Sequence, residues 1–258
     1  MQLIFIEGVS GVGKTTFARK LCDKLNELKR SANCYLEFDF ANPIDFYCAA
    51  YFKQDEYADL FTEYNQFAGD IKNNTIFAGD MRLVRYYNRE MPLFAEPLLT
   101  VLLKREFCWK PANPIPFSEY TRVYKSVWKQ FAQNPGTQFD YLIFDGSLFH
   151  HPTNDMMRNY NASCDQVIHH VNTLIETVNL LHPRVVYLSS DSVAGQLHKA
   201  RISRKESPPT EEQIQFWEKR KQVDSTVMKQ LSILYDIFDI SKGNWDDYIN
   251  AVIDDCDV

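Results

Sequence analysis

Residues 2–17, QLIFIEGVSGVGKTTF, contain the feature that most constrains the fold, an apolar run that leads directly into a glycine-rich turn. The turn from Gly8 to Thr15 fits the pattern G-x-x-x-x-G-K-[ST], which is typical of a phosphate-binding loop, or P-loop, between a strand and a helix. Its glycines let the backbone turn tightly, so that successive N–H groups can point inward at an anion. The sequence therefore predicts an α/β protein whose first strand ends in a phosphate site.

The residues of this turn are expected to act through both backbone and side chains. The backbone N–H groups and the positive end of the following helix would hold phosphates. Lys14 is expected to reach the β- and γ-phosphates as a catalytic residue, and the Thr15 hydroxyl to bind Mg²⁺. The alternative is an ordinary glycine-rich turn. The predicted nucleotide-binding residues are Gly8, Ser10, Gly11, Val12, Gly13, Lys14, Thr15 and Thr16.

The bulk composition is typical of one large α/β domain spanning 1–258. With 258 residues, of which 45% are hydrophobic, the chain can bury a sizeable core. A net charge of −6 argues against broad binding to nucleic acid, so no such partner is expected. The six cysteines have no paired spacing that indicates disulfides or zinc. No apolar segment approaches the ~18 residues that span a bilayer, and we expect a cytoplasmic protein without a membrane partner.

Apolar runs that alternate with helical patterns indicate a parallel sheet with helices on both faces. The expected fold is the three-layer sandwich of P-loop NTPases, built on a sheet of about five strands. The helix after Pro209 should begin with a capping box formed by Thr210 and Gln213. Strands are expected at 2–7, 34–39, 140–145, 184–189 and 234–240, and helices at 14–30, 166–181, 210–231 and 244–254.

The segment 40–138 is too long for one crossover, and it is predicted to be a large, mostly helical insertion after the second strand. A small hairpin is expected at 75–87, with helices at 92–108 and 118–132. Insertions at the carboxyl edge of such a sheet are where a second substrate would bind.

Three arginines of this insertion are candidate substrate contacts. Arg82, Arg85 and Arg89 could hold a phosphate or stack on a base. They could equally lie on a surface strand with their stems along apolar side chains.

Three strings, LIFIEGVSGVGKTT, YLEFDFANPIDF and LIFDGSLFHHP, resemble a group of uncharacterised bacterial P-loop ATP-binding proteins. Over most of the chain, the order of elements resembles P-loop kinases of nucleosides, nucleotides and small molecules, with thymidylate kinase and deoxynucleoside kinases as the nearest named relatives. The resemblance implies ATP and Mg²⁺ as cofactors. Because dimers are common among such kinases, a homodimer is one expected assembly. The insertion matches no substrate signature of these families.

In such kinases an acidic residue at the end of the second strand often acts as catalytic base or orients the acceptor hydroxyl. Glu37 and Asp39 alternate along the expected strand and would therefore share one face. Either could be the base, with Glu37 slightly preferred, and the alternative is a solvated strand end. The chain lacks the proline that follows this acid in deoxynucleoside kinases and the Asp-Arg of thymidylate kinases, which weakens the assignment of a substrate.

Asp145 ends an apolar strand, as a Walker B aspartate does. It is expected to bind Mg²⁺ through a water beside Thr15, the alternative being a turn with Gly146. Ser147 in the following loop is a candidate substrate contact. The neighbouring histidine pairs, at 150–151 and 169–170, cannot easily converge on one ion, so no metal site is expected at either.

The segment 192–208 lies where such kinases carry a lid that closes over the phosphates. Arg201 and Arg204 are three residues apart, one helical turn, and are expected to neutralise charge on the transferred phosphoryl group. A solvated basic helix end is the alternative.

Together these residues predict an ATP- and Mg²⁺-dependent phosphotransferase that moves the γ-phosphate of ATP to a small-molecule acceptor. The acceptor is expected to be a nucleoside, a nucleotide or a similar hydroxyl compound. The alternative function is a P-loop ATPase that hydrolyses nucleotide to regulate a partner. A GTP-dependent switch is disfavoured because the sequence has no Asn-Lys-x-Asp string to bind guanine.

Overall fold

The computed structural model describes residues 1–88, 90–136 and 138–257. The chain divides into two compact units. Unit 1 comprises Met1–Glu37, Gly136–Asn154 and Ser163–Val258, and unit 2 comprises Phe38–Pro135 and Asp155–Ala162. Nearly all of the expected insertion therefore lies in unit 2, whereas the single domain over 1–258 stays a prediction.

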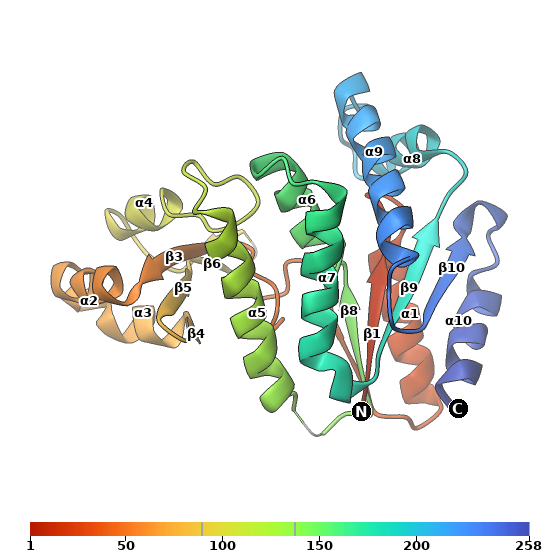
Figure 1. The fold of residues 1–258 in the computed structure, drawn as a ribbon, viewed down its shortest axis with the longest axis horizontal. Coiled ribbons are helices and arrows are strands. Elements are labelled where there is room, and N and C mark those ends of the chain that lie inside the picture. Colours follow the sequence, from red (N-terminus) through yellow and green to blue (C-terminus); the bar gives the residue numbers. More distant parts are fainter. Residues whose placement is uncertain (89, 137, 258) are drawn as a thin grey trace. The chain divides into compact units, whose positions relative to one another are not determined.

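Unit 1 is built around a five-stranded parallel sheet with the order β10-β9-β1-β8-β2 (Figure 1). The central strand places Ile4 opposite Ile143 on one side and Arg184 on the other. Its burial on both sides agrees with helices covering both faces of the sheet. The predicted α/β fold with a parallel sheet of about five strands is thus confirmed. The strands are β1 (Gln2–Glu7), β2 (Ala32–Tyr35), β8 (Tyr141–Asp145), β9 (Pro183–Ser189) and β10 (Tyr235–Asp239).

The helices of unit 1 cover the two faces of this sheet. Figure 1 shows α7 and α9 on the near face, while α1 and α10 pack together on the other. The expected capping box is present at α9, where Thr210 accepts from the Gln213 N–H and the Gln213 side chain accepts from the Thr210 N–H. The helices are α1 (Lys14–Glu27), α7 (Cys164–Val178), α8 (Val193–Ser203), α9 (Glu211–Met228) and α10 (Trp245–Asp254), with short 3₁₀ turns η2 (Asn179–Leu181), η3 (Ile240–Lys242) and η4 (Asp255–Asp257).

Helix α6 (His150–Asn159) was not expected from the sequence. It begins with two histidines and a proline, and its first half has no apolar period that would separate it from a loop. Proline is compatible with the first turn of a helix, because the N–H groups there have no intrahelical partner.

The second strand is shorter than predicted, and this changes the expected arrangement of two candidate residues. β2 pairs with β8 only as far as Tyr35, after which the chain turns and Phe38 adopts a positive φ of 62°. Glu37 and Asp39 therefore do not share a strand face, and they fall into different units. That part of the prediction was wrong because the backbone leaves the extended conformation on which side-chain alternation depends.

Unit 2 contains more helix than strand, as predicted, but its sheet is larger than the expected hairpin. Its antiparallel sheet has the order β3-β5-β4, and the predicted hairpin at 75–87 is confirmed by the β4–β5 pair. The third strand, β3, pairs with β5 and was missed. The elements are β3 (Ala49–Lys53), α2 (Gln54–Glu63), η1 (Asn65–Phe67), α3 (Ala68–Asn73), β4 (Thr75–Ala78), β5 (Met81–Arg85), β6 (Tyr87–Asn88), β7 (Met91–Pro92), α4 (Leu98–Leu103) and α5 (Phe117–Gln133).

Helix α5 supplies much of the aromatic core of unit 2. Tyr120, Tyr124 and Trp128 are fully or almost fully buried on one face of the helix. The Tyr124 ring meets Phe46 edge-on at 4.5 Å, and the Tyr120 ring stacks on Phe107 at 5.3 Å. The predicted helix at 118–132 is thus confirmed, whereas that at 92–108 is reduced to α4.

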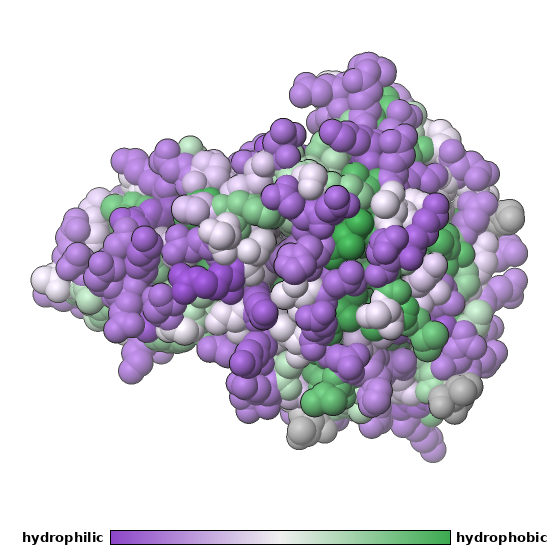
Figure 2. Space-filling view, in the orientation of Figure 1, coloured by the Kyte–Doolittle hydropathy of each residue, from purple (hydrophilic) through white to green (hydrophobic). Residues whose placement is uncertain are grey.

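The surface of the molecule is largely hydrophilic in the view of Figure 2, with hydrophobic groups gathered over α7, α9 and β10. Leu180, Leu234 and Ile237 are among the exposed apolar side chains. Within residues 1–88, 90–136 and 138–257, no helix has both the length and the apolar character needed to cross a membrane.

Candidate active site

The P-loop lies between β1 and α1 and is enclosed by neighbouring helices. Gly11 and Gly13 have positive φ values of 85° and 90°. A Cβ at Gly11 would lie 2.9 Å from Ala200 of α8, and one at Gly13 would lie 2.7 Å from the Trp245 ring. Only glycine meets both the backbone and the packing requirement at these positions.

The first turn of α1 lacks the features that usually satisfy a helix N-terminus. Its N-cap is Gly13, which offers no side-chain cap, and no acidic residue lies in the first turn. The exposed N–H groups and the helix dipole therefore favour an external anion at this end. This is the geometry that the P-loop pattern predicts.

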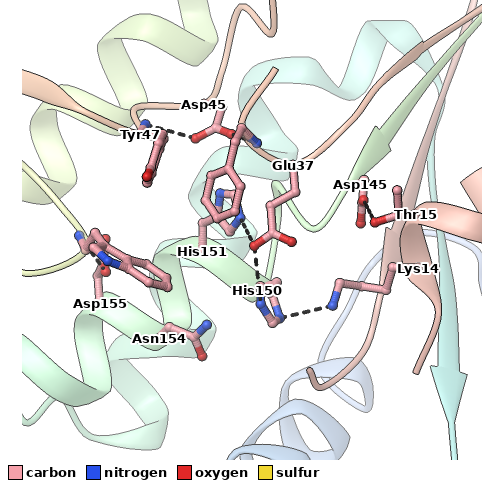
Figure 3. Close-up of polar contacts among 12 residues, drawn as sticks. Lys14, Thr15, Glu37, Asp45, Tyr47, Asp145, His150, His151, Asn154 and Asp155 are labelled. Carbon is pink, nitrogen blue, oxygen red and sulfur yellow. Dashed lines mark hydrogen bonds and ion pairs between the residues drawn. The ribbon is translucent and has the colours of Figure 1, made fainter. Parts of the chain in front are cut away.

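Lys14 points into the interior of the loop and is only 6% exposed. Its ammonium nitrogen lies 3.3 Å from the Val9 carbonyl oxygen, to which it donates, and 3.3 Å from Nδ1 of His150 (Figure 3). Both of these contacts are with neutral atoms, so neither introduces a negative charge beside the ammonium.

Thr15 and Asp145 lie together, as expected from the sequence. The Thr15 hydroxyl donates to Asp145 Oδ2 at 2.6 Å, and within the described residues Oδ1 of this buried carboxylate has no hydrogen-bond partner. Burial raises the pKa of Asp145, while Lys14 and the Thr15 hydrogen bond act in the opposite direction. A buried carboxylate with one unpartnered oxygen next to a hydroxyl fits the oxygen ligands that Mg²⁺ prefers.

The described residues contain no cluster of three or more His, Cys, Asp or Glu side chains that could hold a metal ion. An ion beside Thr15 and Asp145 would therefore take its other ligands from water and substrate phosphates. This is the usual mode of Mg²⁺, which keeps several waters and binds through one or two carboxylates.

Glu7, the last residue of β1, was missed by sequence reasoning. It is fully buried, and its two oxygens accept from the N–H groups of Leu148 at 2.8 Å and His150 at 3.0 Å. Burial raises the pKa of Glu7 to about 7, although the backbone hydrogen bonds act to lower it. This carboxylate holds the start of α6 against the P-loop strand. An acid at the end of the apolar run QLIFIE was the available signal.

Glu37 belongs to unit 1 and contacts both histidines of α6. Its Oε1 lies 3.2 Å from Nε2 of His151 and 3.9 Å from Nε2 of His150 (Figure 3). From the sequence, these histidines were considered only as metal ligands, and that role was judged unfavourable. Their place between Glu37 and the P-loop was not foreseen.

Arg220 of α9 forms a buried network behind His150. Its Nε donates to Asp224 at 2.8 Å, and one Nη donates to the His150 carbonyl at 3.1 Å and to the Asn154 side chain. Asp224 also accepts from the Tyr187 hydroxyl at 2.9 Å. Sequence reasoning missed this network, because an arginine within a polar helix pattern is usually exposed.

The predicted lid segment contains α8 and the turn that follows it. Gln196 of α8 donates to the Gly11 carbonyl at 2.8 Å, which ties this helix to the P-loop. Arg201 donates to the Ser207 carbonyl and to the Gln213 side chain at 3.1 Å, and it pairs with Glu206 at 3.5 Å. Arg204 is the first residue after α8 and is exposed.

The candidate substrate residues belong to different units of the chain. Arg82 donates to the carbonyls of Gly79 and Met81, and Arg85 donates to those of Phe40, Asn42 and Asp45. These guanidinium groups therefore satisfy backbone carbonyls within unit 2. Ser147 belongs to unit 1 and is 2% exposed. Arg89 lies outside the described residues.

Unit 2 carries a cluster of three partly exposed rings that sequence reasoning did not single out. The Phe38 and Tyr47 ring centroids are 4.2 Å apart, and Trp109 lies 6.2 Å from Phe38 and 6.5 Å from Tyr47. Asp45 accepts from the N–H groups of Phe38 and Tyr47, and Asp155 accepts from that of Trp109. Both carboxylates are almost fully buried, so they hold the backbone beneath the rings.

Comparisons with known proteins give similar folds but no family. No protein-family model matches the chain, and no curated protein matches it. Similar solved structures include the YorR protein of Bacillus subtilis in complex with phosphorylated GDP, at 14% identity and a TM-score of 0.43 over 98% of this chain and 94% of that chain. Shikimate kinase from Bacteroides thetaiotaomicron is 12% identical, with a TM-score of 0.43 over 100% of this chain and 99% of that chain. Likenesses at this level carry no argument about function, which rests on the site itself.

The buried Glu7 carboxyl should make the stability of unit 1 depend on pH. Because the pKa is about 7 in the folded state and 4.5 as the ordinary value, the folded state binds the proton more tightly. The free energy of unfolding should fall as pH rises between these values, by on the order of 3 kcal/mol from this group. Glu7→Gln should remove that fall, measured by urea unfolding at pH 5 and pH 8.

The exposed Glu218 of α9 provides the matched control, since Glu218→Gln should keep the wild-type dependence. An equal loss of stability between pH 5 and pH 8 in the wild type and in Glu7→Gln would contradict the role given to Glu7.

Proposed function

We propose that this protein is an ATP- and Mg²⁺-dependent phosphotransferase that moves the γ-phosphate of ATP to a small-molecule acceptor. The observation that carries the proposal is the Thr15–Asp145 hydrogen bond at the mouth of a P-loop whose helix has no side-chain cap. A hydroxyl, a buried carboxylate and exposed N–H groups at one place suit a nucleotide phosphate with its divalent ion.

Different residues of unit 1 would bind the phosphates and the Mg²⁺ ion of the nucleotide. The N–H groups of the P-loop and of the first turn of α1 would bind phosphate oxygens, and Lys14 would lie against the β- and γ-phosphates. Thr15 and Asp145 would hold Mg²⁺, which when bound neutralises charge on those phosphates. Lys14 adds a fixed positive charge where negative charge develops during transfer.

We assign the role of general base to Glu37 rather than Asp39. Glu37 lies in the unit that contains the P-loop, and His151 holds its carboxylate by a 3.2 Å contact. Asp39 belongs to unit 2, and its Oδ1 accepts from the Ala41 N–H at 3.0 Å as part of a turn. A turn-forming aspartate needs no catalytic explanation.

The segment 192–208 is proposed to act as the lid. Arg201 and Arg204 would then meet charge on the transferred phosphoryl group when the segment closes, as such lids do. The contacts of Arg201 with Ser207 and Glu206 give it alternative partners in the absence of nucleotide.

We propose that the acceptor contains a planar ring, as a nucleoside or nucleotide does. The support comes from unit 2, where Phe38, Tyr47 and Trp109 expose part of their rings on a backbone held by buried carboxylates. Aromatic side chains fixed in this way lose little entropy when a flat ligand stacks on them.

Lys14→Ala should lower transfer by roughly 10²–10³-fold and weaken ATP binding, because the charge that it removes acts on the transferring phosphate. The measurement is ADP release with a panel of nucleosides, nucleotides, sugars and amino-alcohols as acceptors. Lys20→Ala, on the exposed side of the same helix, is the matched control and should behave as the wild type.

In this panel a phosphotransferase releases ADP only slowly until its acceptor is supplied. Fast ATP hydrolysis that no acceptor changes would favour an ATPase that regulates a partner, and it would refute the phosphotransferase.

Glu37→Gln should lower kcat by roughly 10²–10⁴-fold with little change in ATP affinity, because a positioned general base contributes in this range. Asp39→Asn serves as the matched control and should retain most of the activity. The opposite order of effects, with Asp39→Asn the more damaged variant, would reassign the base.

Trp109→Ala should raise the acceptor KM about tenfold and leave the ATP KM unchanged, because loss of one stacked ring removes about 1–1.5 kcal/mol. Trp109→Phe keeps a ring and should recover most of the affinity. Equal effects of both variants on ATP and acceptor would show that the residue does not select the acceptor.

A further inference from the structure

We propose that His150 is a positioning residue that orients the Lys14 ammonium with a neutral ring nitrogen. Its effect on transfer rests on the function proposed above, whereas the contact itself can be tested without any activity. His150 lies on the first turn of α6, and Nδ1 of its buried ring is 3.3 Å from Lys14 Nζ.

The Lys14 ammonium needs a second acceptor, such as His150 Nδ1, if its N–H groups are to have a fixed direction. An ammonium group has three N–H donors on a flexible stem, so one acceptor does not fix its direction. Val9 O accepts at 3.3 Å and His150 Nδ1 lies at the same distance. With two of the N–H groups directed at protein acceptors, the third has a defined direction and is available to a phosphate oxygen.

The protonation of His150 follows from the groups around it. Burial, reinforced by Lys14, lowers the pKa of His150 well below its usual value, so the ring is neutral. The Gly8 carbonyl lies 3.2 Å from Nδ1 and would accept from a proton there, whereas the Lys14 ammonium at 3.3 Å can only donate and therefore favours a lone pair. We assign the lone pair to Nδ1, because a hydrogen bond from a charged donor is the stronger of the two. This assignment places the proton on Nε2, on the side of Glu37, whose Oε1 is 3.9 Å away.

One contact of the ring and two contacts of the backbone hold His150 in place. The indole of Trp217 on α9 stacks on the imidazole, with centroids 5.2 Å apart and planes 10° from parallel. The His150 N–H donates to Glu7, and the His150 carbonyl accepts from Arg220. The two backbone contacts fix the position of His150, and the imidazole cannot turn away from Lys14 without losing its stack on Trp217.

A neutral acceptor has an advantage over a carboxylate at this position. A carboxylate would pair with the ammonium, cancel part of its charge and repel an incoming phosphate. An imidazole lone pair directs the ammonium without placing a further negative charge beside it, in addition to those of Asp145 and Glu7. Interactions that preorganise a charge before the reaction contribute mainly to the transition state.

The contact can be tested by ¹⁵N NMR of the imidazole groups, in the wild type and in Lys14→Met. We expect His150 Nδ1 to be unprotonated and hydrogen-bonded in the wild type, and to shift toward the free lone-pair value when the lysine is replaced. A protonated Nδ1, or a signal that Lys14→Met leaves unchanged, would overturn the proposal. Unchanged signals from the buried His170 of α7 would show that the fold is retained.

The consequence for transfer can be tested by three replacements at one position. His150→Asn places a neutral polar atom near the site of Nδ1 and should keep kcat within about threefold of the wild type. His150→Leu should lower kcat about tenfold or more with a smaller change in the ATP KM, and His150→Asp should weaken ATP binding more than His150→Asn. His169→Leu is the control for loss of a histidine and should leave kinetics unchanged.

The two experiments separate the two proposals. If no acceptor supports transfer, the proposed function fails, and the NMR comparison still decides whether His150 orients Lys14. Equal kcat in His150→Asn and His150→Leu, in an enzyme that does transfer phosphate, would show that the ring only fills space.

Discussion

The two hydrogen bonds accepted by Glu7 determine how the parts of the proposed phosphate site meet. This carboxylate lies at the last position of β1, and its partners are Leu148 in the turn after β8 and His150 at the start of α6. Without it, two backbone N–H groups at the start of a buried helix would lack partners, which is costly. The same two bonds fix where α6 begins, and they thereby place His150 beside Lys14. A carboxyl group buried at the end of β1 thus determines where His150 lies relative to Lys14, although it does not itself contact Lys14.

Unit 1 buries several charged groups near the P-loop, and their pairing explains how the unit tolerates them. Lys14 is held by neutral acceptors, Asp145 by a hydroxyl, and Arg220 by Asp224 and a backbone carbonyl. Burial of a charge is tolerable only where hydrogen bonds replace lost hydration. Asp145 has an incomplete set of hydrogen bonds, because one of its carboxylate oxygens has no partner in the part of the chain that the structure describes. The least satisfied group is the one that we assign to a metal ion.

The parts of the fold that the sequence predicts correctly depend on local patterns. The P-loop, the sheet strands of unit 1 and the capping box of α9 follow from apolar runs, glycine spacing and Thr210 with Gln213. The end of β2 was wrong because the alternation in YLEFD continues past the point where pairing with β8 stops. Strand β3 was missed because its partner β5 comes later in the sequence, after α2 and α3, so that no local pattern links the two strands. The roles of Glu7, His150 and Arg220 depend on contacts between residues far apart in sequence, which no local pattern contains.

The uncapped first turn of α1 has a consequence for the protein outside its reaction. A helix end that lacks a side-chain cap takes its missing partner from the solution, so the folded state gains stability from whichever anion is present. Phosphate or sulfate in a buffer would occupy the same N–H groups that a nucleotide needs. The melting temperature of this protein, and its affinity for the nucleotide that we propose, should therefore depend on the anions in the buffer. Samples prepared in different buffers would differ in both, although their covalent structure is the same.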